Sequence, residues 1–186
     1  MGTKGTTSYR IYDQNALHYI TIATVEWIDF FTRRKYKDII VDSLVYCRKG
    51  KGLELYCYVV MTNHIHLICR AKEGFKLSDI LRDFKRHTAK YIIKQIQENP
   101  QESRREWLLE ILQKAGSKNQ KNKIYQFWRQ DNHPVALTKT ETIDQKLDYI
   151  HNNPVEEGFV QRPEDYLYSS ARNYAELDNV LEIDFI

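Results

Sequence analysis

Two kinds of hydrophobic pattern divide the chain into predicted strands and helices. Runs of β-branched and aromatic residues predict strands at residues 18–25 and 55–60, and alternating positions predict a third at 64–68, after a polar Thr-Asn break. Apolar positions three or four residues apart predict helices, each with one buried stripe. These helices are expected at residues 32–49, 78–97, 102–115 and 142–153.

Residue types at the ends of the last two helices predict where they start and stop. Ser103 is placed to cap the third helix, and Gly116 to end it. Thr142 and Gln145 have the Thr-x-x-Gln spacing of a capping box, so the fourth helix is expected to begin there. It is expected to end before Pro154, because the residue that precedes a proline disfavours helical geometry.

The order of these elements predicts the fold. Strand, helix, strand, strand and helix are the first five elements of a split β-α-β sandwich. We therefore expect an α+β, ferredoxin-like domain, with an antiparallel sheet, helices on one face and a further C-terminal helix. The last strand is predicted at residues 124–129, which makes residues 98–123 an insertion. A single domain over residues 1–186 is expected, with a flexible tail at residues 1–8.

Composition narrows the classes to which the chain can belong. Of its 186 residues, 42% are apolar, but no run approaches the roughly 20 apolar residues of a membrane span, so no membrane association is expected. Cys47, Cys57 and Cys69 form no C-x-x-C pair, which argues against a disulfide framework or a cysteine zinc site and favours a cytoplasmic protein. The formal charge of +3 permits a nucleic-acid partner without requiring one.

The third predicted strand carries the first candidate for chemistry. Because side chains alternate along a strand, His64 and His66 project from one face while Ile65 and Leu67 anchor the other face in the core. Two imidazoles at this spacing can bind one divalent cation or a phosphate oxygen. The alternative is a half-buried strand whose polar face happens to carry histidines.

The fourth predicted helix carries the second candidate. Tyr149 lies about 200° around the helix from the buried Leu147. It shares that outer face with Gln145, Lys146 and Asn153, and Asn153 is one turn beyond it on the same side. A tyrosine turned away from the core, toward polar side chains, is a candidate for a chemical role. Chance exposure of one tyrosine among 13 is the alternative.

Three stretches stand out when they are taken together. They are Val59-Val60-Met61-Thr62-Asn63-His64-Ile65-His66-Leu67-Ile68, the pair Phe127-Trp128, and Leu147-Asp148-Tyr149-Ile150-His151-Asn152-Asn153-Pro154-Val155. In this combination they resemble the motifs of the REP-associated tyrosine transposases, which are single-tyrosine HUH transposases. The resemblance covers residues 9–175. Thr62 departs from it, because relatives usually have proline there.

The resemblance implies a mechanism and gives each motif residue a role in it. His64 and His66 would be metal ligands, Asn153 a third ligand, and Tyr149 the nucleophile. The metal, Mg²⁺ or Mn²⁺, would polarise the scissile phosphate, and attack by the tyrosine would form a 5′-phosphotyrosine on single-stranded DNA folded as hairpins. On ligand type alone, two imidazoles and an amide would also suit Zn²⁺ or Ni²⁺.

Basic and aromatic residues elsewhere are candidates for binding DNA phosphates and unpaired bases. They lie around the polar loop at residues 117–123, on the outer face of the helix at 78–97, and beside the tyrosine. The candidates are Lys118, Lys121, Lys123, Tyr125, Trp128, Arg129, Lys146, Arg82 and Arg86. For Trp128 the alternative is a place in the core. For Arg82 and Arg86 it is a solvated face of ion pairs with Asp79 and Asp83.

The sequence thus predicts a metal-dependent transposase that cleaves and rejoins single-stranded DNA at hairpins. One alternative is a DNA-binding regulator that keeps the fold without turnover. Another is a zinc hydrolase, which would need a third histidine or an acidic ligand. We expect a monomer or a homodimer, because enzymes of the resembled group include monomers and dimers that exchange the tyrosine helix.

Overall fold

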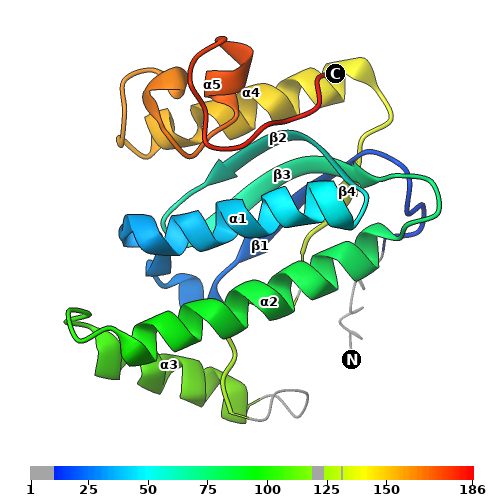
Figure 1. Ribbon diagram of the computed structural model, residues 1–186. Coiled ribbons are helices and arrows are strands. Elements are labelled where there is room, and N and C mark those ends of the chain that lie inside the picture. The colour runs from blue at the N-terminus through cyan, green and yellow to red at the C-terminus, as the bar shows by residue number, and fades with distance from the viewer. Residues whose placement is uncertain (1–10, 119–123, 131) are drawn as a thin grey trace, which may run out of the picture.

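A four-stranded antiparallel sheet is the centre of the computed structural model, which describes residues 11–118, 124–130 and 132–186 (Figure 1). The tail predicted at residues 1–8 lies outside these ranges. In chain order the strands and α-helices are β1 His18–Ala23, α1 Arg34–Gly50, β2 Leu53–Val60, β3 His64–Ala71, α2 Leu77–Glu98, α3 Arg105–Ser117, β4 Val135–Ala136, α4 Thr140–Glu156 and α5 Ala171–Tyr174. Short 3-10 turns occur at Val25–Trp27, Phe30–Thr32 and Pro163–Asp165.

The two faces of the sheet are covered by different helices. The strands lie in the order β2-β3-β1-β4, which is the order of a split β-α-β sandwich and confirms the predicted α+β, ferredoxin-like fold. Helices α1 and α2 lie together along one face (Figure 1), where Ile65 and Leu67 of β3 are fully buried. The opposite face carries His64 and His66 and is covered by α4. No helix within the described ranges is long and apolar enough to cross a membrane.

The last strand of the sheet is shorter and lies later in the chain than predicted. β4 pairs with the first half of β1, whereas the strand predicted at residues 124–129 forms only an isolated bridge from Trp128 to Thr24. The prediction was wrong because an aromatic run suits a strand and a core equally well. Phe127 and Trp128 are apolar because they fill the core against Phe31.

Helices α3 and α4 begin without the predicted side-chain caps. Ser103 makes no capping hydrogen bond, because Arg104 is the N-cap of α3, and the helix continues one residue past Gly116. The capping box at Thr142 does not form either, because α4 begins two residues earlier, at Thr140. Burial of an apolar stripe rather than capping therefore holds both helices in place.

Pro154 lies inside α4 instead of ending it. The helix runs on to Glu156, and the backbone N–H of Glu157 donates to the carbonyl of Asn153 at 3.1 Å. A proline this close to the C-terminus of a helix removes only one N–H donor from the hydrogen-bond ladder. The consequence for the site is that Asn153 keeps helical geometry and stays one turn beyond Tyr149.

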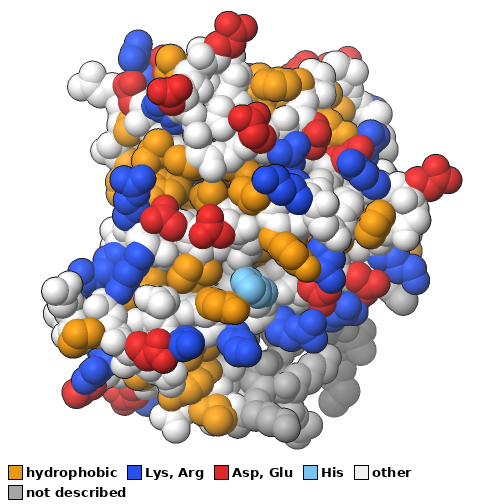
Figure 2. Space-filling model, in the orientation of Figure 1, with side chains coloured by type: hydrophobic (Ala, Val, Ile, Leu, Met, Phe, Trp, Pro, Cys, Tyr) orange, Lys and Arg blue, Asp and Glu red, His pale blue; other side chains and the backbone are white. Residues whose placement is uncertain are grey.

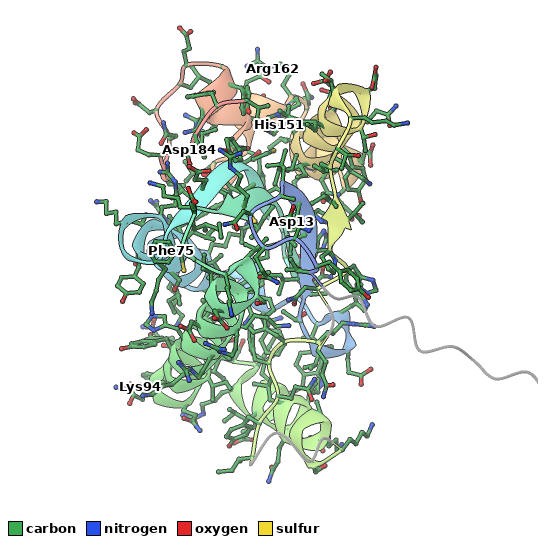
Figure 3. The ribbon with its side chains drawn as sticks, turned by 90° about the vertical axis from the view of Figure 1, so that its right-hand side faces the viewer. Asp13, Phe75, Lys94, His151, Arg162 and Asp184 are labelled. Atoms are coloured by element: carbon green, nitrogen blue, oxygen red, sulfur yellow. The ribbon has the colours of Figure 1, made fainter. Side chains whose placement is uncertain are left out.

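The outer edge of β2 is covered by the C-terminal segment. The backbone N–H of Val60 donates to the carbonyl of Tyr168, and that of Ser170 donates to the carbonyl of Tyr58, each at 2.9 Å. Asp184, shown in Figure 3, bonds farther along the same edge. Covered in this way, the edge does not offer an unpaired row of N–H and C=O groups to another chain.

A buried carboxylate joins the start of α3 to α1. Glu102 is 4% exposed, accepts a 2.8 Å hydrogen bond from the hydroxyl of Tyr36, and pairs at 2.8 Å with Nε of Arg33. Burial by itself raises the pKa of a carboxyl group, but the hydrogen bonds from Tyr36 and Arg33 outweigh it and hold the pKa of Glu102 below its ordinary value. The carboxylate is thus ionised and paired in the folded protein.

We expect Glu102→Gln to lower the free energy of unfolding by about 2 kcal/mol at pH 7, because Arg33 loses its partner while the shape of the side chain is kept. Glu98→Gln is the matched control, since Glu98 is exposed and makes only an i,i+4 pair with Lys94; its effect should stay within about 0.5 kcal/mol. Urea unfolding measures both.

The difference in free energy of unfolding between wild type and Glu102→Gln should also depend on pH. A carboxyl group whose pKa is lower in the folded state contributes stability above its unfolded-state pKa, and this contribution is lost as the pH falls through the folded-state pKa. The difference between wild type and Glu102→Gln should therefore shrink below about pH 4. A difference that is absent at pH 7, or that grows in acid, would contradict the assignment.

Candidate active site

The histidines of β3 lie at the sheet face that α4 covers. In the antiparallel register Thr21 of β1 is directly opposite His66, and Ala23 is opposite His64. The two imidazole centroids are 4.6 Å apart. The predicted placement of both histidines on one face of one strand is therefore confirmed, and the small Ala23 leaves space beside His64.

Hydrogen bonds from β1 orient His66. Its Nδ1 lies 2.9 Å from the hydroxyl of Tyr19 and 3.0 Å from the hydroxyl of Thr21. The ring is 4% exposed, and burial lowers the pKa of His66 to about 3, with the charge of Lys146 acting in the same direction. His66 is thus a neutral imidazole whose Nδ1 is engaged, which directs Nε2 toward the site.

A side-chain amide orients His64. Nδ1 of His64 lies 2.7 Å from Oδ1 of Asn63, and Nδ2 of the same amide donates to the carbonyl of Trp27 and to Oδ1 of Asp29, each at 3.1 Å. Because the amide uses its nitrogen for these two bonds, its oxygen faces His64, and Nδ1 must carry the proton. Nε2 of His64 is then an acceptor, and burial lowers the pKa of this histidine as well.

A buried cluster holds α4 against the sheet. Nε2 of His151 lies 2.9 Å from the hydroxyl of Ser170 and 3.3 Å from Sγ of Cys57, and the Ser170 hydroxyl also accepts from the backbone N–H of Tyr58 at 2.9 Å. Figure 3 shows His151 between α4 and the segment that follows it. Burial lowers the pKa of His151 to about 4, so this residue joins α4, β2 and the C-terminal segment as a neutral group.

This packing brings Tyr149 to the histidines. The Tyr149 ring lies edge-on, 5.4 Å from the His66 ring and 6.3 Å from the Tyr19 ring. Nζ of Lys146 lies 5.3 Å from the Tyr149 ring and 4.5 Å from the Tyr19 ring. Tyr149 is 39% exposed, so its phenol is open to an approaching ligand. The side of α4 that carries Lys146, Tyr149 and Asn153 therefore borders the histidines.

Asn153 completes a set of three donor groups. It is 6% exposed, and it lies close enough to His64 to favour the protonated form of that ring. No described donor makes a hydrogen bond to its Oδ1. A buried amide oxygen without a partner is costly, and a metal ion between the two histidines and Asn153 would relieve that cost. Among the described residues, no three His, Cys, Asp or Glu side chains form a metal site; the donor set here has two histidines and one amide.

Five of the nine predicted DNA-binding residues are buried, ion-paired or outside the described ranges. Trp128 is buried and its indole N–H donates to Thr88, so its ring is not available to a base, and the core alternative is right. Arg82 and Arg86 form ion pairs with Asp83, although basic side chains still gather over α2 in the lower half of Figure 2. Lys121 and Lys123 lie outside the described residues.

Two of the remaining candidates, Tyr125 and Arg129, line a groove. A hollow of about 590 Å³ between α2 and residues 125–130 is lined by Tyr125 and Arg129 together with Arg82, Arg86 and Lys90 of α2. Lys118 lines an adjoining hollow that Arg129 also borders. The groove is thus basic with one half-buried tyrosine, and it lies apart from Lys146, which is in the site itself.

The residues that hold the histidines and α4 in place were not predicted from the sequence. Tyr19 and Thr21 alternate in the first strand, but only the strand register shows that they meet His66. Asn63 was a visible signal, because an amide directly before His64 is within reach of its ring. His151 lies next to the buried stripe of α4, yet its partners come from two distant segments.

Comparisons with known proteins agree with this geometry. The family described as "Transposase IS200 like" matches residues 13–109, more than half of the chain, including both histidines but not the tyrosine helix. A solved structure of a REP-associated tyrosine transposase bound to a REP hairpin shares the fold, with a TM-score of 0.64 and 17% identity over 94% of this chain and 89% of that one.

A second solved structure, of a Deinococcus radiodurans protein assigned as a transposase, is 18% identical and covers 77% of this chain and 94% of its own, with a TM-score of 0.44. No curated protein matches the chain. The match to the family covers β1, β2, β3, both histidines and α2 and settles the classification: the chain belongs to the IS200-like transposases.

Proposed function

We propose that this transposase cleaves and rejoins single-stranded DNA through a covalent 5′-phosphotyrosine on Tyr149. One observation carries the proposal: a partly exposed tyrosine, two neutral histidines whose Nδ1 atoms are already hydrogen-bonded, and a buried amide next to His64 meet at one place. An exposed phenol beside such a donor set is the arrangement of an activated nucleophile next to an electrophile-binding site.

We infer that His64, His66 and Asn153 hold one divalent metal ion. Two imidazoles and an amide leave space for phosphate oxygens and water, which suits Mg²⁺ or Mn²⁺ when the substrate is bound. A bound ion of this kind neutralises and polarises a scissile phosphodiester. The hydrogen bonds to Nδ1 hold both rings in place, and the Asn63 amide favours the tautomer of His64 that leaves its Nε2 unprotonated.

The residues of α4 would perform the covalent step. The phenol oxygen of Tyr149 attacks phosphorus and loses its proton to solvent, the bond from phosphorus to O3′ breaks, and O3′ takes up a proton and leaves as a 3′-hydroxyl. The Lys146 ammonium, 5.3 Å from the Tyr149 ring, stabilises negative charge on the phenol oxygen. Because a phenolate is a good leaving group, a DNA hydroxyl can reverse the step and rejoin the strand.

We propose that the DNA is a hairpin with an unpaired arm. The fold neighbour is described as bound to a REP hairpin, and the groove between α2 and residues 125–130 provides basic side chains for a phosphate backbone. Tyr149 and both histidines come from one chain, so a single copy contains the complete candidate site.

A covalent adduct should form between the protein and a labelled hairpin taken from the DNA that flanks the coding region. Wild type with Mn²⁺ should give a shifted band on a denaturing gel, and EDTA should remove it. Tyr149→Phe lacks the nucleophilic oxygen, and His64→Ala lacks one ligand, so each should lower adduct formation by at least about 100-fold.

Tyr46→Phe is the matched control, because Tyr46 is an exposed tyrosine of α1 on the other side of the sheet. It should form the adduct like wild type. An adduct that persists in Tyr149→Phe would refute the proposed nucleophile. Hairpin binding without any adduct would instead favour a DNA-binding regulator of the same fold.

Tyr19→Phe should weaken Mn²⁺ binding by about tenfold, because His66 loses a hydrogen bond that orients its ring, whereas Thr21 still holds it. Isothermal titration of the DNA-free protein with Mn²⁺ measures this directly, and Tyr46→Phe is again the control. If Tyr19→Phe binds Mn²⁺ as wild type does, the Tyr19 hydroxyl does not orient His66 for metal binding.

A further inference from the structure

An exposed tryptophan stands at the rim of the candidate site. Trp27 follows β1 in the 3-10 turn Val25–Trp27 and is 48% exposed. Its ring lies edge-on to the His64 ring, with centroids 5.7 Å apart. A single exposed apolar side chain is ordinary by itself, but this ring borders the candidate site. Trp27 is not among the aromatic residues that the sequence suggested for binding DNA.

The turn that presents Trp27 is strained and held in place. Glu26 and Trp27 are consecutive residues with φ of 53° and 54°, a left-handed conformation that is unfavourable for residues other than glycine. The carbonyl of Trp27 accepts from Nδ2 of Asn63, and the hydroxyl of Thr24 donates to the carbonyl of Ile28 at 2.8 Å. Asn63 is also the residue that orients His64, so one side-chain amide fixes both His64 and Trp27.

A cationic side chain connects this tryptophan to the basic groove. Cζ of Arg129 lies 5.6 Å from the Trp27 ring centroid, and the backbone N–H of Arg129 donates to the carbonyl of Ala23 at the end of β1. Arg129 also lines the groove between α2 and residues 125–130 and the hollow next to it. A continuous path therefore runs from His64 past Trp27 and Arg129 into the groove.

We propose that Trp27 is a stacking platform for the unpaired base next to the scissile phosphate, and that Arg129 contacts a phosphate farther along the strand. This inference rests on the proposed function, because it gives the DNA strand a path out of the site. Aromatic stacking accepts any base and needs an exposed, fixed ring. The carboxylates of Glu26 and Asp29 flank the turn and repel phosphates, which leaves the ring face for the base.

Binding should be measured in a Tyr149→Phe background, so that no cleavage occurs, with a fluorescent hairpin that carries a single-stranded arm. Trp27→Ala should weaken binding roughly tenfold, and Trp27→Phe, which keeps an aromatic face, should recover most of it. Trp107→Ala is the matched control, because Trp107 on α3 is also 48% exposed and lies away from the histidines. It should bind like the parent protein.

Two further measurements locate the stacked base. In Trp107→Phe the described tryptophans that remain are Trp27 and the buried Trp128, so quenching of the exposed emission by the hairpin would report stacking on Trp27. Abasic sites would also be placed one at a time along the arm. At one position the abasic site should weaken binding by the parent protein, and the same site should not weaken binding by Trp27→Ala.

The proposed stacking on Trp27 would be wrong if Trp27→Ala and Trp107→Ala bound the hairpin equally well, without quenching and without a sensitive abasic position. That outcome differs from failure of the proposed function, which appears as a missing adduct in protein with both Tyr149 and Trp27 intact. A circular dichroism spectrum equal to that of the parent shows that each variant is folded, so a loss of binding reports the side chain.

Discussion

The packing of α4 on the histidine face of the sheet is the constraint on which the site depends. The helix brings Tyr149 to within 5.4 Å of His66 and buries Asn153 beside His64. It is held by the buried hydrogen bonds of His151 with Ser170 and Cys57, and Ser170 is itself part of the segment that covers β2. The C-terminal segment thus covers the edge of β2 and fixes α4. The last part of the chain therefore determines where Tyr149 lies relative to the histidines.

The histidines are held from the opposite direction, by the sheet. Tyr19 and Thr21 engage His66 across the ladder, and Asn63 engages His64 from the preceding turn. In each case Nδ1 is hydrogen-bonded and burial lowers the pKa of the ring, so that Nε2 of a neutral ring would be the atom to bind the proposed metal ion. The site therefore needs no carboxylate ligand.

Periodicity predicted three strands, the four main helices and the ferredoxin-like order, because each depends on one buried face. The pairing of His64 with His66, and of Tyr149 with Asn153, followed from the same rule. Contacts between distant segments could not be predicted. Phe127 and Trp128 suggested a strand but fill the core, and the two residues of β4 are too few to give a pattern. Tyr19 and His151 find their partners through strand register and the path of the C-terminal segment.

Peptide mapping of the covalent product tests the central claim most directly. The protein would be trapped with its hairpin in Mn²⁺, digested with protease and nuclease, and sequenced by mass spectrometry. Our account predicts one modified peptide, with a nucleotide joined through its 5′-phosphate to Tyr149, and a released DNA fragment that ends in a 3′-hydroxyl. A nucleotide on another residue, a 3′-phosphate linkage, or cleaved DNA with no modified peptide would contradict it.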